Sequence, residues 1–354
     1  MKKRLLIITQ SVDADGGVLE FFIDWIRGLA AEFSRVDVIT LSAGRHELPP
    51  NVHVYSLGKE RKVPRVARWI RLAFLLAWRV PQADTVFAHM SPAFALAAWP
   101  VTFVTGRRLV LWYLHRSRTM RLRLAARLAD AVVTANVDSL TLRTAKVIAI
   151  GHGIPVDKFS SVRDGTLHSP VRILTVGRIT PIKNLETLIA AAARAIHRGT
   201  RVRIKIIGQP AMAGDSDYLK RLKNLVSEHK LAAEVEFAGY VAHERLPEEY
   251  RQADVYVGLT PAGGIDKTLL EAMASGCIVL TSNAIMKEYF GPYADQLIFA
   301  YGDSDDLARK LESVIGLSDG MRTEISRFLG LSVRNHHDLN KFIKRLTEIL
   351  YGAY

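Results

Sequence analysis

The sequence predicts an α/β protein built from two doubly wound, Rossmann-like domains. The chain has 354 residues, which is more than one hydrophobic core usually organises. Short apolar runs alternate with amphipathic stretches, a pattern typical of parallel sheets that are covered by helices on both faces. The alternation stops in a polar stretch near the middle of the chain and then starts again. Two domains of the same class are therefore expected.

In the first half, apolar runs with the length of strands are separated by segments with helical periodicity. The first run is followed by a loop that contains Gly16 and Gly17, and then by a helix over 18–31. This loop lacks the GxGxxG spacing of a dinucleotide site. The strands expected in this half are 4–9, 36–40, 52–55, 85–88, 108–113, 131–134 and 147–150.

Two segments of the first half admit a membrane interpretation. Residues 64–80 predict an amphipathic helix with four arginines and two tryptophans. This composition fits an interfacial membrane contact, and it also fits a packed helix with a solvated arginine face. Residues 85–106 carry no charged side chain over a length that could cross a bilayer. Because Pro92 and Pro100 interrupt them, we expect a buried strand and a buried helix instead.

Charge and cysteine content narrow the class of protein. The formal net charge is +13, and residues 1–160 hold 23 Lys and Arg against 12 Asp and Glu, so the second half is close to neutral. A basic domain suits an anionic membrane surface, nucleic acid or small acidic substrates. Cys277 is the single cysteine, so the chain has no disulfide framework, and a reducing cytoplasmic location is expected.

The second half repeats the alternation after a polar stretch that marks the domain boundary. The strands expected here are 172–176, 202–207, 235–237, 254–259 and 277–280. The helices expected between them are 185–198, 217–230 and 245–252. The expected domains are 1–160 and 161–330, and we expect a terminal helix over 331–354 to pack back toward the first domain.

Charged side chains gather at strand-to-helix loops of the second half. Arg178 and Lys183 follow the strand 172–176, so both should lie at the carboxyl edge of the sheet, where α/β proteins bind ligands. Two fixed cations at that edge suit a diphosphate. Glu271 lies in another helix of the same half, and its carboxylate would suit ribose hydroxyls. Together these residues predict a nucleotide diphosphate site.

The runs GRITPIKNLETLIAAA and GGIDKTLLEAMASGCIVLTSN resemble the retaining glycosyltransferases of family 4, which have the GT-B fold. The resemblance covers most of the chain, with weaker matches at the first glycine loop, WYLH and IGHGIPVDKF. It implies a nucleotide-sugar donor held mainly by the second domain and a sugar or lipid-linked acceptor held mainly by the first. It also implies transfer without a cofactor or an obligatory metal, and no nucleic-acid partner is expected.

The resemblance also implies roles for individual residues. Arg178 and Lys183 would bind the donor diphosphate and stabilise it as it leaves. His115, which follows the strand 108–113, would lie near the reacting sugar, and Glu271 would accept hydrogen bonds from the ribose. The other expected donor-binding residues are Gly16, Gly17, Gly177, Gly208, Tyr240, Val241, Gly264, Asp266, Lys267 and Thr268.

One position departs from the family pattern. The family has two glutamates eight positions apart, and the first, which contacts the donor sugar, would fall at Gly263. Asp266 could take over this contact while Lys267 adds positive charge, the donor could differ, or the enzyme could be weakened. We favour the first explanation. Asp266 could also cap the helix that carries Glu271.

Three functional hypotheses follow. The leading one is a retaining glycosyltransferase. In it, the acceptor hydroxyl attacks the anomeric carbon from the same face as the one from which the leaving group departs. The second is a GT-B epimerase or phosphorylase, although nothing in the sequence indicates a pyridoxal lysine. The third is a weakened GT-B protein that binds a membrane or nucleic-acid surface. With a lipid-linked acceptor, a peripheral position on the cytoplasmic leaflet would use Arg61, Lys62, Arg65, Arg68 and Arg71.

Overall fold

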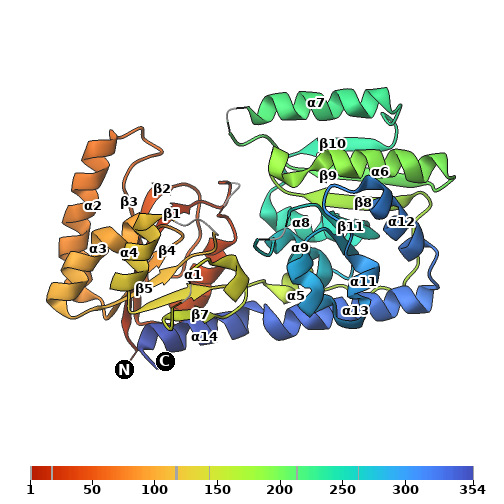
Figure 1. Ribbon diagram of the computed structural model, residues 1–354. Coiled ribbons are helices and arrows are strands. Elements are labelled where there is room, and N and C mark those ends of the chain that lie inside the picture. Colours follow the sequence, from red (N-terminus) through yellow and green to blue (C-terminus); the bar gives the residue numbers. More distant parts are fainter. Residues whose placement is uncertain are drawn as a thin grey trace. The chain divides into compact units, whose positions relative to one another are not determined.

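The computed structural model describes residues 2–16, 19–115, 119–142, 144–212, 214–261 and 263–353. The chain forms two compact α/β units, and Figure 1 labels most of their elements. Unit 1 comprises Met1–Gly153 and Asp338–Tyr354, and unit 2 comprises Ile154–His337. The predicted fold class is confirmed. The division lies a few residues before the expected boundary at 160, and the C-terminal segment belongs to unit 1.

Unit 1 contains a parallel sheet with the strand order β3-β2-β1-β4-β5-β6-β7. Its strands are β1 (Arg4–Val12), β2 (Arg35–Ala43), β3 (Val52–Ser56), β4 (Thr85–His89), β5 (Arg108–Trp112), β6 (Ala131–Thr134) and β7 (Val147–Ala149). β1 is longer than the predicted 4–9, because its polar end continues the ladder with β2, where Ser11 pairs with Ser42. Polar side chains hid this extension from the sequence pattern.

Helices cover both faces of this sheet. They are α1 (Phe22–Glu32), α2 (Arg65–Arg79), α3 (Pro92–Thr105), α4 (Met120–Leu128) and α14 (Leu339–Tyr351), with short 3₁₀ turns at Val80–Gln82 and Val137–Ser139. α1 and α14 share one core with alternate residues of β1, and α2, α3 and α4 share the core on the other face. Trp25 of α1 and Phe342 of α14 are in ring contact, with centroids 4.1 Å apart. α14 is thus part of the first core.

The two membrane interpretations of unit 1 have separate outcomes. The charge-free stretch 85–106 forms β4 and α3, as predicted, with Pro100 inside the helix. No helix among the described residues combines the length and the apolar character that crossing a bilayer requires. The predicted helix 64–80 is α2, whose buried side is formed mainly by leucines. The helix expected from residue 18 begins at Phe22, and residues 17–18 lie outside the described part of the chain.

Unit 2 contains a second parallel sheet with the order β10-β9-β8-β11-β12. Its strands are β8 (Val171–Val176), β9 (Val202–Ile207), β10 (Val235–Gly239), β11 (Val255–Gly258) and β12 (Ile278–Thr281). Its helices are α5 (Val156–Phe159), α6 (Leu185–His197), α7 (Asp215–Glu228), α8 (Leu246–Gln252), α9 (Lys267–Ala274), α10 (Lys287–Phe290), α11 (Ala294–Leu297), α12 (Ser304–Ile315) and α13 (Asp319–His336). The order of connection reverses between β8 and β11, which makes this the switch point of the sheet.

The terminal helix expected over 331–354 is divided between the end of α13 and α14. The break lies at His337 and Asp338, and the Asp338 carboxylate accepts a hydrogen bond from the backbone N–H of Lys341, at 3.0 Å, as the N-cap of α14. The two helices belong to different units. Helical periodicity continues across the break, so the sequence pattern did not reveal it.

Candidate functional site

The loops that follow β8 and β11 lie side by side, because these strands are neighbours at the switch point of unit 2. The first loop carries Gly177, Arg178 and Lys183, and it includes a 3₁₀ turn over Pro181–Lys183. A Cβ atom at Gly177 would lie 3.3 Å from Cε of Lys183, so the lysine chain runs close to this glycine. Backbone geometry therefore helps to place Lys183 at the edge of the sheet.

A second glycine of this edge is required by close backbone packing. Gly208 follows β9 with a φ of 143°, and its N–H donates to the carbonyl of Gly239 at 2.8 Å. A Cβ atom at Gly208 would lie 1.8 Å from the carbonyl oxygen of Gly177. Only glycine fits there, so the loops after β8, β9 and β10 can pack backbone against backbone.

Lys183 forms an ion pair with Asp266, and their Nζ and Oδ2 atoms are 2.7 Å apart. Thr260 links the pair, because its hydroxyl accepts from Lys183 at 3.1 Å and donates to the same Asp266 oxygen. The side chains of Lys183 and Asp266 are 19% and 34% exposed, so both remain open to a ligand. Within the described residues, the Asp266 carboxylate caps no backbone N–H of α9, so the capping alternative is wrong.

The charge of Asp266 is stabilised by its neighbours. Burial alone would raise the pKa of this carboxyl, but Lys183, the Thr260 hydroxyl and Arg178 together lower it below its ordinary value. Burial would likewise raise the pKa of Asp215 at the start of α7, whereas backbone donors and Arg178 lower it. Arg178 itself is exposed. The edge of the sheet thus holds two cations beside ionised carboxylates.

Glu271 is 2% exposed and is held by two side chains that sequence reasoning missed. Its Oε1 lies 2.9 Å from Nε2 of His243, and its Oε2 accepts from the hydroxyl of Tyr250 at 3.0 Å. Burial, and after it the Glu271 charge, raise the pKa of Tyr250 well above its ordinary value, so this hydroxyl stays a donor. Each carboxylate oxygen has capacity for a further hydrogen bond.

The loop between β11 and α9 is tied to the end of β12. The Asn283 amide donates to the carbonyl of Gly264 at 2.6 Å, and the Ser282 hydroxyl donates to the carbonyl of Thr260 at 3.2 Å. Gly263, where the family has a glutamate, has a φ of 156°, a value that side chains with a Cβ rarely adopt. The backbone at this position therefore suits glycine.

The remaining predicted residues are divided between the units. Tyr240, 39% exposed, and Val241 follow β10, while Lys267 and Thr268 begin α9 in unit 2. The Thr268 hydroxyl accepts from Tyr256 at 2.9 Å. In unit 1, Gly16 lies in a turn after β1, and His115 is exposed after β5, with its ring 5.5 Å from that of Tyr113. Gly17 lies outside the described residues.

In the part of the chain that the structure describes, no group of three or more His, Cys, Asp or Glu is arranged to hold a metal ion.

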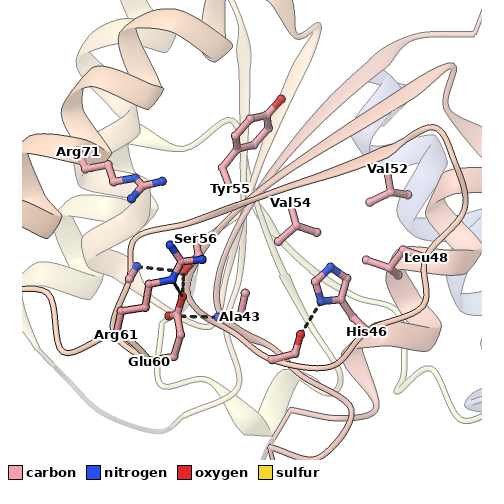
Figure 2. Close-up of a pocket in the computed structure, with 12 residues that line it drawn as sticks. Ala43, His46, Leu48, Val52, Val54, Tyr55, Ser56, Glu60, Arg61 and Arg71 are labelled. Carbon is pink, nitrogen blue, oxygen red and sulfur yellow. Dashed lines mark hydrogen bonds and ion pairs between the residues drawn. The ribbon is translucent and has the colours of Figure 1, made fainter.

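Unit 1 contains a pocket of about 650 Å³ between the ends of β2, β3 and α2, shown in Figure 2. Its polar groups largely satisfy one another. Glu60 accepts from the Ser56 hydroxyl at 2.7 Å and pairs with Arg61 at 3.8 Å, and His46 is hydrogen-bonded to the carbonyl of Gly44 at 2.8 Å. Arg61 and Arg71, which were predicted for a membrane contact, line this pocket, but none of the predicted catalytic or donor-binding residues does.

A second pocket of unit 1, of about 400 Å³, lies at the switch point of the first sheet. Gln10 and Ser91 line it from the ends of β1 and β4, which are neighbours in the sheet. The remainder of the lining is basic or apolar and consists of Leu41, Leu57, Lys59, Arg65, Arg68, Trp69, Leu72, Ala93 and Phe94. Arg65 and Arg68 were predicted for a membrane contact, but a pocket at this place was not predicted.

The sequence of unit 2 is similar to known glycosyltransferases. Residues 160–327 match the family described as glycosyl transferases group 1. The amylovoran biosynthesis glycosyltransferase AmsK of Erwinia amylovora is 28% identical over 207 residues, which cover 56% of this chain and 49% of that protein. The mannosylfructose-phosphate synthase of Agrobacterium fabrum is 33% identical over 106 residues, which cover 29% and 23%. The chain thus spans about half, or less, of the length of these curated relatives.

Solved structures match over the whole chain. Alr3699/HepE of Anabaena, solved with UDP and glucose, has a TM-score of 0.79 at 17% identity, with 99% of this chain and 100% of that chain covered. The sucrose-phosphate synthase of Thermosynechococcus elongatus has a TM-score of 0.78 at 17% identity, with 100% of both chains covered. These identities support the fold alone. The fold that they share with this chain is GT-B. The family match covers most of unit 2, so this unit is similar to the glycosyl transferases of group 1.

Proposed function

We propose that this protein transfers a sugar from a nucleotide-diphospho-sugar to an acceptor hydroxyl, with retention of the anomeric configuration. The observation that carries the proposal is the pairing of Lys183 with Asp266 at the switch point of unit 2, beside Arg178. This arrangement offers cations for a diphosphate and a carboxylate for sugar hydroxyls at one edge. The Anabaena protein was solved with UDP-glucose, so a uridine diphosphate sugar is the first donor to test.

Binding of the donor would replace the ion pair between Lys183 and Asp266 by contacts of each residue with the donor. In the described structure the Lys183 ammonium is neutralised by Asp266. A bound diphosphate would draw Lys183 toward its oxygens and free Asp266 to accept hydrogen bonds from the sugar. Its lowered pKa keeps Asp266 ionised near neutral pH and therefore able to accept from hydroxyl groups. Glu271, oriented by His243 and Tyr250, would accept from the ribose.

The reaction needs no protein nucleophile. The bond between the anomeric carbon and the diphosphate oxygen breaks, and the acceptor oxygen forms a bond to that carbon on the same face. The acceptor proton passes to the departing phosphate oxygen. Arg178 and Lys183 stabilise the charge that develops on the leaving diphosphate, which is the role that a metal ion has in other transferases. His115 of unit 1 would act near the reacting sugar.

The second pocket of unit 1 is the proposed acceptor site. Lys59, Arg65 and Arg68 give it positive charge, while Trp69 and Phe94 give it apolar surface. Such a lining suits an acceptor that has an anionic group next to an apolar part, as a lipid-linked sugar does. A cytoplasmic protein positioned peripherally at a membrane would reach such an acceptor.

A panel of nucleotide-sugars tests the donor site through thermal unfolding, because a ligand at about 100 times its Kd stabilises a protein by about 2.7 kcal/mol.

Lys183→Ala should weaken donor affinity by about 100-fold, because Asp266 loses its partner and the diphosphate loses one of its two cations. Lys220→Ala is the matched control, because its ion pair with Asp217 is exposed on α7. If Lys183→Ala binds and turns over donor as the unaltered chain does, the proposal fails. The anomeric proton coupling of the product reports retention.

A weakened protein that binds donors without turnover is the second candidate, and Gly263 is the observation that favours it. Gly263→Glu restores the glutamate of the family. We expect no gain in turnover, because the φ of 156° disfavours a side chain and Asp266 already provides a carboxylate. A large gain would show that Asp266 does not replace the missing glutamate.

Asp266→Asn should lower turnover at least tenfold if Asp266 contacts the sugar.

A further inference from the structure

The outward side of α2 is apolar. Val66, Ile70 and Phe74, four residues apart, are 71%, 67% and 66% exposed. Arg65 and Arg71 of α2 are exposed as well, so the solvent side of this helix carries both arginines and apolar residues. Arg79 is buried and stacks over the ring of Trp78, with its guanidinium carbon 3.6 Å from the ring centroid. Exposed apolar residues that continue over three turns of one helix need a partner to cover them.

The same apolar character continues onto the neighbouring helices. α3 packs against both α2 and α4, and the inner sides of all three bury against one face of the sheet (Figure 1). On α3, Phe103 and Val104 are 71% and 83% exposed, and on α4, Met120 and Leu124 are 74% and 49% exposed. We call the exposed apolar set of these helices the α2–α4 face, which consists of Val66, Trp69, Ile70, Phe74, Trp78, Phe103, Val104, Met120 and Leu124.

The charges around this face are almost all of one sign. Residues 61–129 contain thirteen Lys and Arg and one acidic residue, Asp84, while the whole chain has a net charge of +13. Nearly all of the net charge thus lies in the segment that forms the α2–α4 face. Helices α2, α3 and α4 contain no acidic residue, and Arg121, Arg123 and Arg127 of α4 are exposed.

We propose that the α2–α4 face docks unit 1 on an anionic lipid bilayer. Its apolar side chains would enter the interface between headgroups and acyl chains, and the arginines would lie among the lipid phosphates. A second copy of this chain would present the same positive charge and be repelled. Nucleic acid would satisfy the arginines but would leave the bulky aliphatic side chains uncovered. An anionic bilayer satisfies both kinds of residue.

The proposal goes beyond the transfer reaction and does not depend on it. If both hold, docking would bring the acceptor pocket to the lipid surface, because α2 contributes to both. Arg65, Arg68 and Trp69 of this helix line that pocket. A lipid-linked acceptor could then enter without leaving the membrane entirely.

Flotation of the full chain with lipid vesicles tests the proposal. Vesicles that contain phosphatidylglycerol should carry the protein, vesicles of phosphatidylcholine alone should carry little, and binding should fall as salt rises. All five tryptophans lie in unit 1, and Trp69 and Trp78 are 43% and 47% exposed. Their fluorescence should shift to the blue on binding and should be quenched by brominated acyl chains, which would show insertion and not only charge attraction.

Two sets of variants separate the apolar contribution from the charge contribution. Ile70→Ser with Phe74→Ser should lower partitioning about tenfold or more, because it removes exposed apolar surface without changing charge. Arg121→Gln, Arg123→Gln and Arg127→Gln together should lower it by about 100-fold at low salt. Met321→Ser with Leu331→Ser, on exposed sites of α13 in unit 2, is the matched control and should leave partitioning unchanged.

Vesicle flotation and the thermal shift with donor test different proposals and can fail separately. Equal binding to neutral and anionic vesicles, no binding to either, or unchanged partitioning of the Ile70 and Phe74 variant would overturn the proposal. Capture of RNA or of an acidic protein in place of vesicles would overturn it in favour of that partner. The variants of this face should keep the thermal shift with donor, so loss of flotation with an intact donor shift concerns the lipid surface alone.

Discussion

The two sheets have their switch points in equivalent places, but their loops carry different chemistry. In unit 2, charges of both signs meet, as Lys183 pairs with Asp266. In unit 1, the equivalent pocket is lined by Lys59, Arg65 and Arg68 without an acidic residue. The parallel fold fixes where a ligand can bind in each unit, because the carboxyl ends of the strands open at that edge. The loops then decide what is bound.

The helices that cover the sheets differ in the same way. In unit 2, all the residues of α9 from Leu269 to Ala274 are buried, including Glu271. In unit 1, α2 buries little beyond its leucines and leaves a broad apolar side exposed. A helix that is covered by its own unit can hold a polar group in a fixed orientation, whereas a helix with an uncovered apolar side is suited to a partner.

The comparison can be tested unit by unit, because each unit has its own probe. All the tryptophans are in unit 1, and Cys277, the single cysteine, is buried in unit 2. Tryptophan fluorescence in urea therefore follows unit 1, and labelling of the cysteine thiol follows unit 2.

The largest effect is expected for Phe342→Ala. Phe342 of α14 is 1% exposed and packs on Trp25 and Trp112, so its removal leaves a cavity in the core of unit 1. The unfolding free energy reported by tryptophan fluorescence should fall by about 3–5 kcal/mol. Labelling of Cys277 should keep its urea midpoint. A parallel shift of both probes would show that the units unfold together.

Gly208→Ala should act on the other unit. The added Cβ would lie 1.8 Å from the carbonyl oxygen of Gly177, and the φ of 143° is unfavourable for alanine. Unit 2 should lose about 3 kcal/mol of unfolding free energy, measured by thiol labelling in urea. Gly320→Ala, where a Cβ meets nothing within 4 Å, serves as the control. An unchanged midpoint for Gly208→Ala would mean that the two loops separate easily.

Tyr250→Phe should have a smaller effect on stability and should also lower donor affinity. It removes the hydroxyl that donates to Oε2 of Glu271, inside a site where both side chains are buried. Unit 2 should lose about 1–3 kcal/mol of unfolding free energy, because a buried carboxylate loses a partner. Donor affinity should fall as well if Glu271 binds the ribose. A loss of stability with unchanged donor affinity would leave Glu271 with a structural role only.

The smallest effect concerns pH. Burial raises the pKa of the Cys277 thiol from its ordinary value of 9.0 to about 11. The folded pKa lies above the unfolded one, so this contribution to the stability of unit 2 is complete below about pH 9 and is lost between about pH 9 and 11. Cys277→Ala should remove this part of the pH dependence, measured by proteolytic susceptibility of unit 2. If the stability of unit 2 falls equally with pH in the unaltered protein and in Cys277→Ala, the pH dependence does not come from this thiol.

The strands were predictable because apolar runs of strand length recur between helical segments. All twelve predicted strands are present, two with the predicted ends and ten with one or both ends shifted. The edge that holds Arg178, Lys183 and Asp266 was also predictable, since these residues follow strands along the chain. His243 and Tyr250 were missed because they reach Glu271 from more than twenty residues earlier, and no local spacing connects them. The same reason hid Asn283, whose partner is the carbonyl of Gly264.

By itself, the sequence determined the class of fold, the two units and the loops that meet in unit 2, because these depend on periodicity and on the order of strands. Tertiary structure alone decided which sides of the helices stay uncovered and which carboxylates are paired. Periodicity could not assign the outward side of α2, because that helix has apolar residues on both sides and only packing selects one. Partners distant in sequence likewise meet only when the sheet brings their loops together.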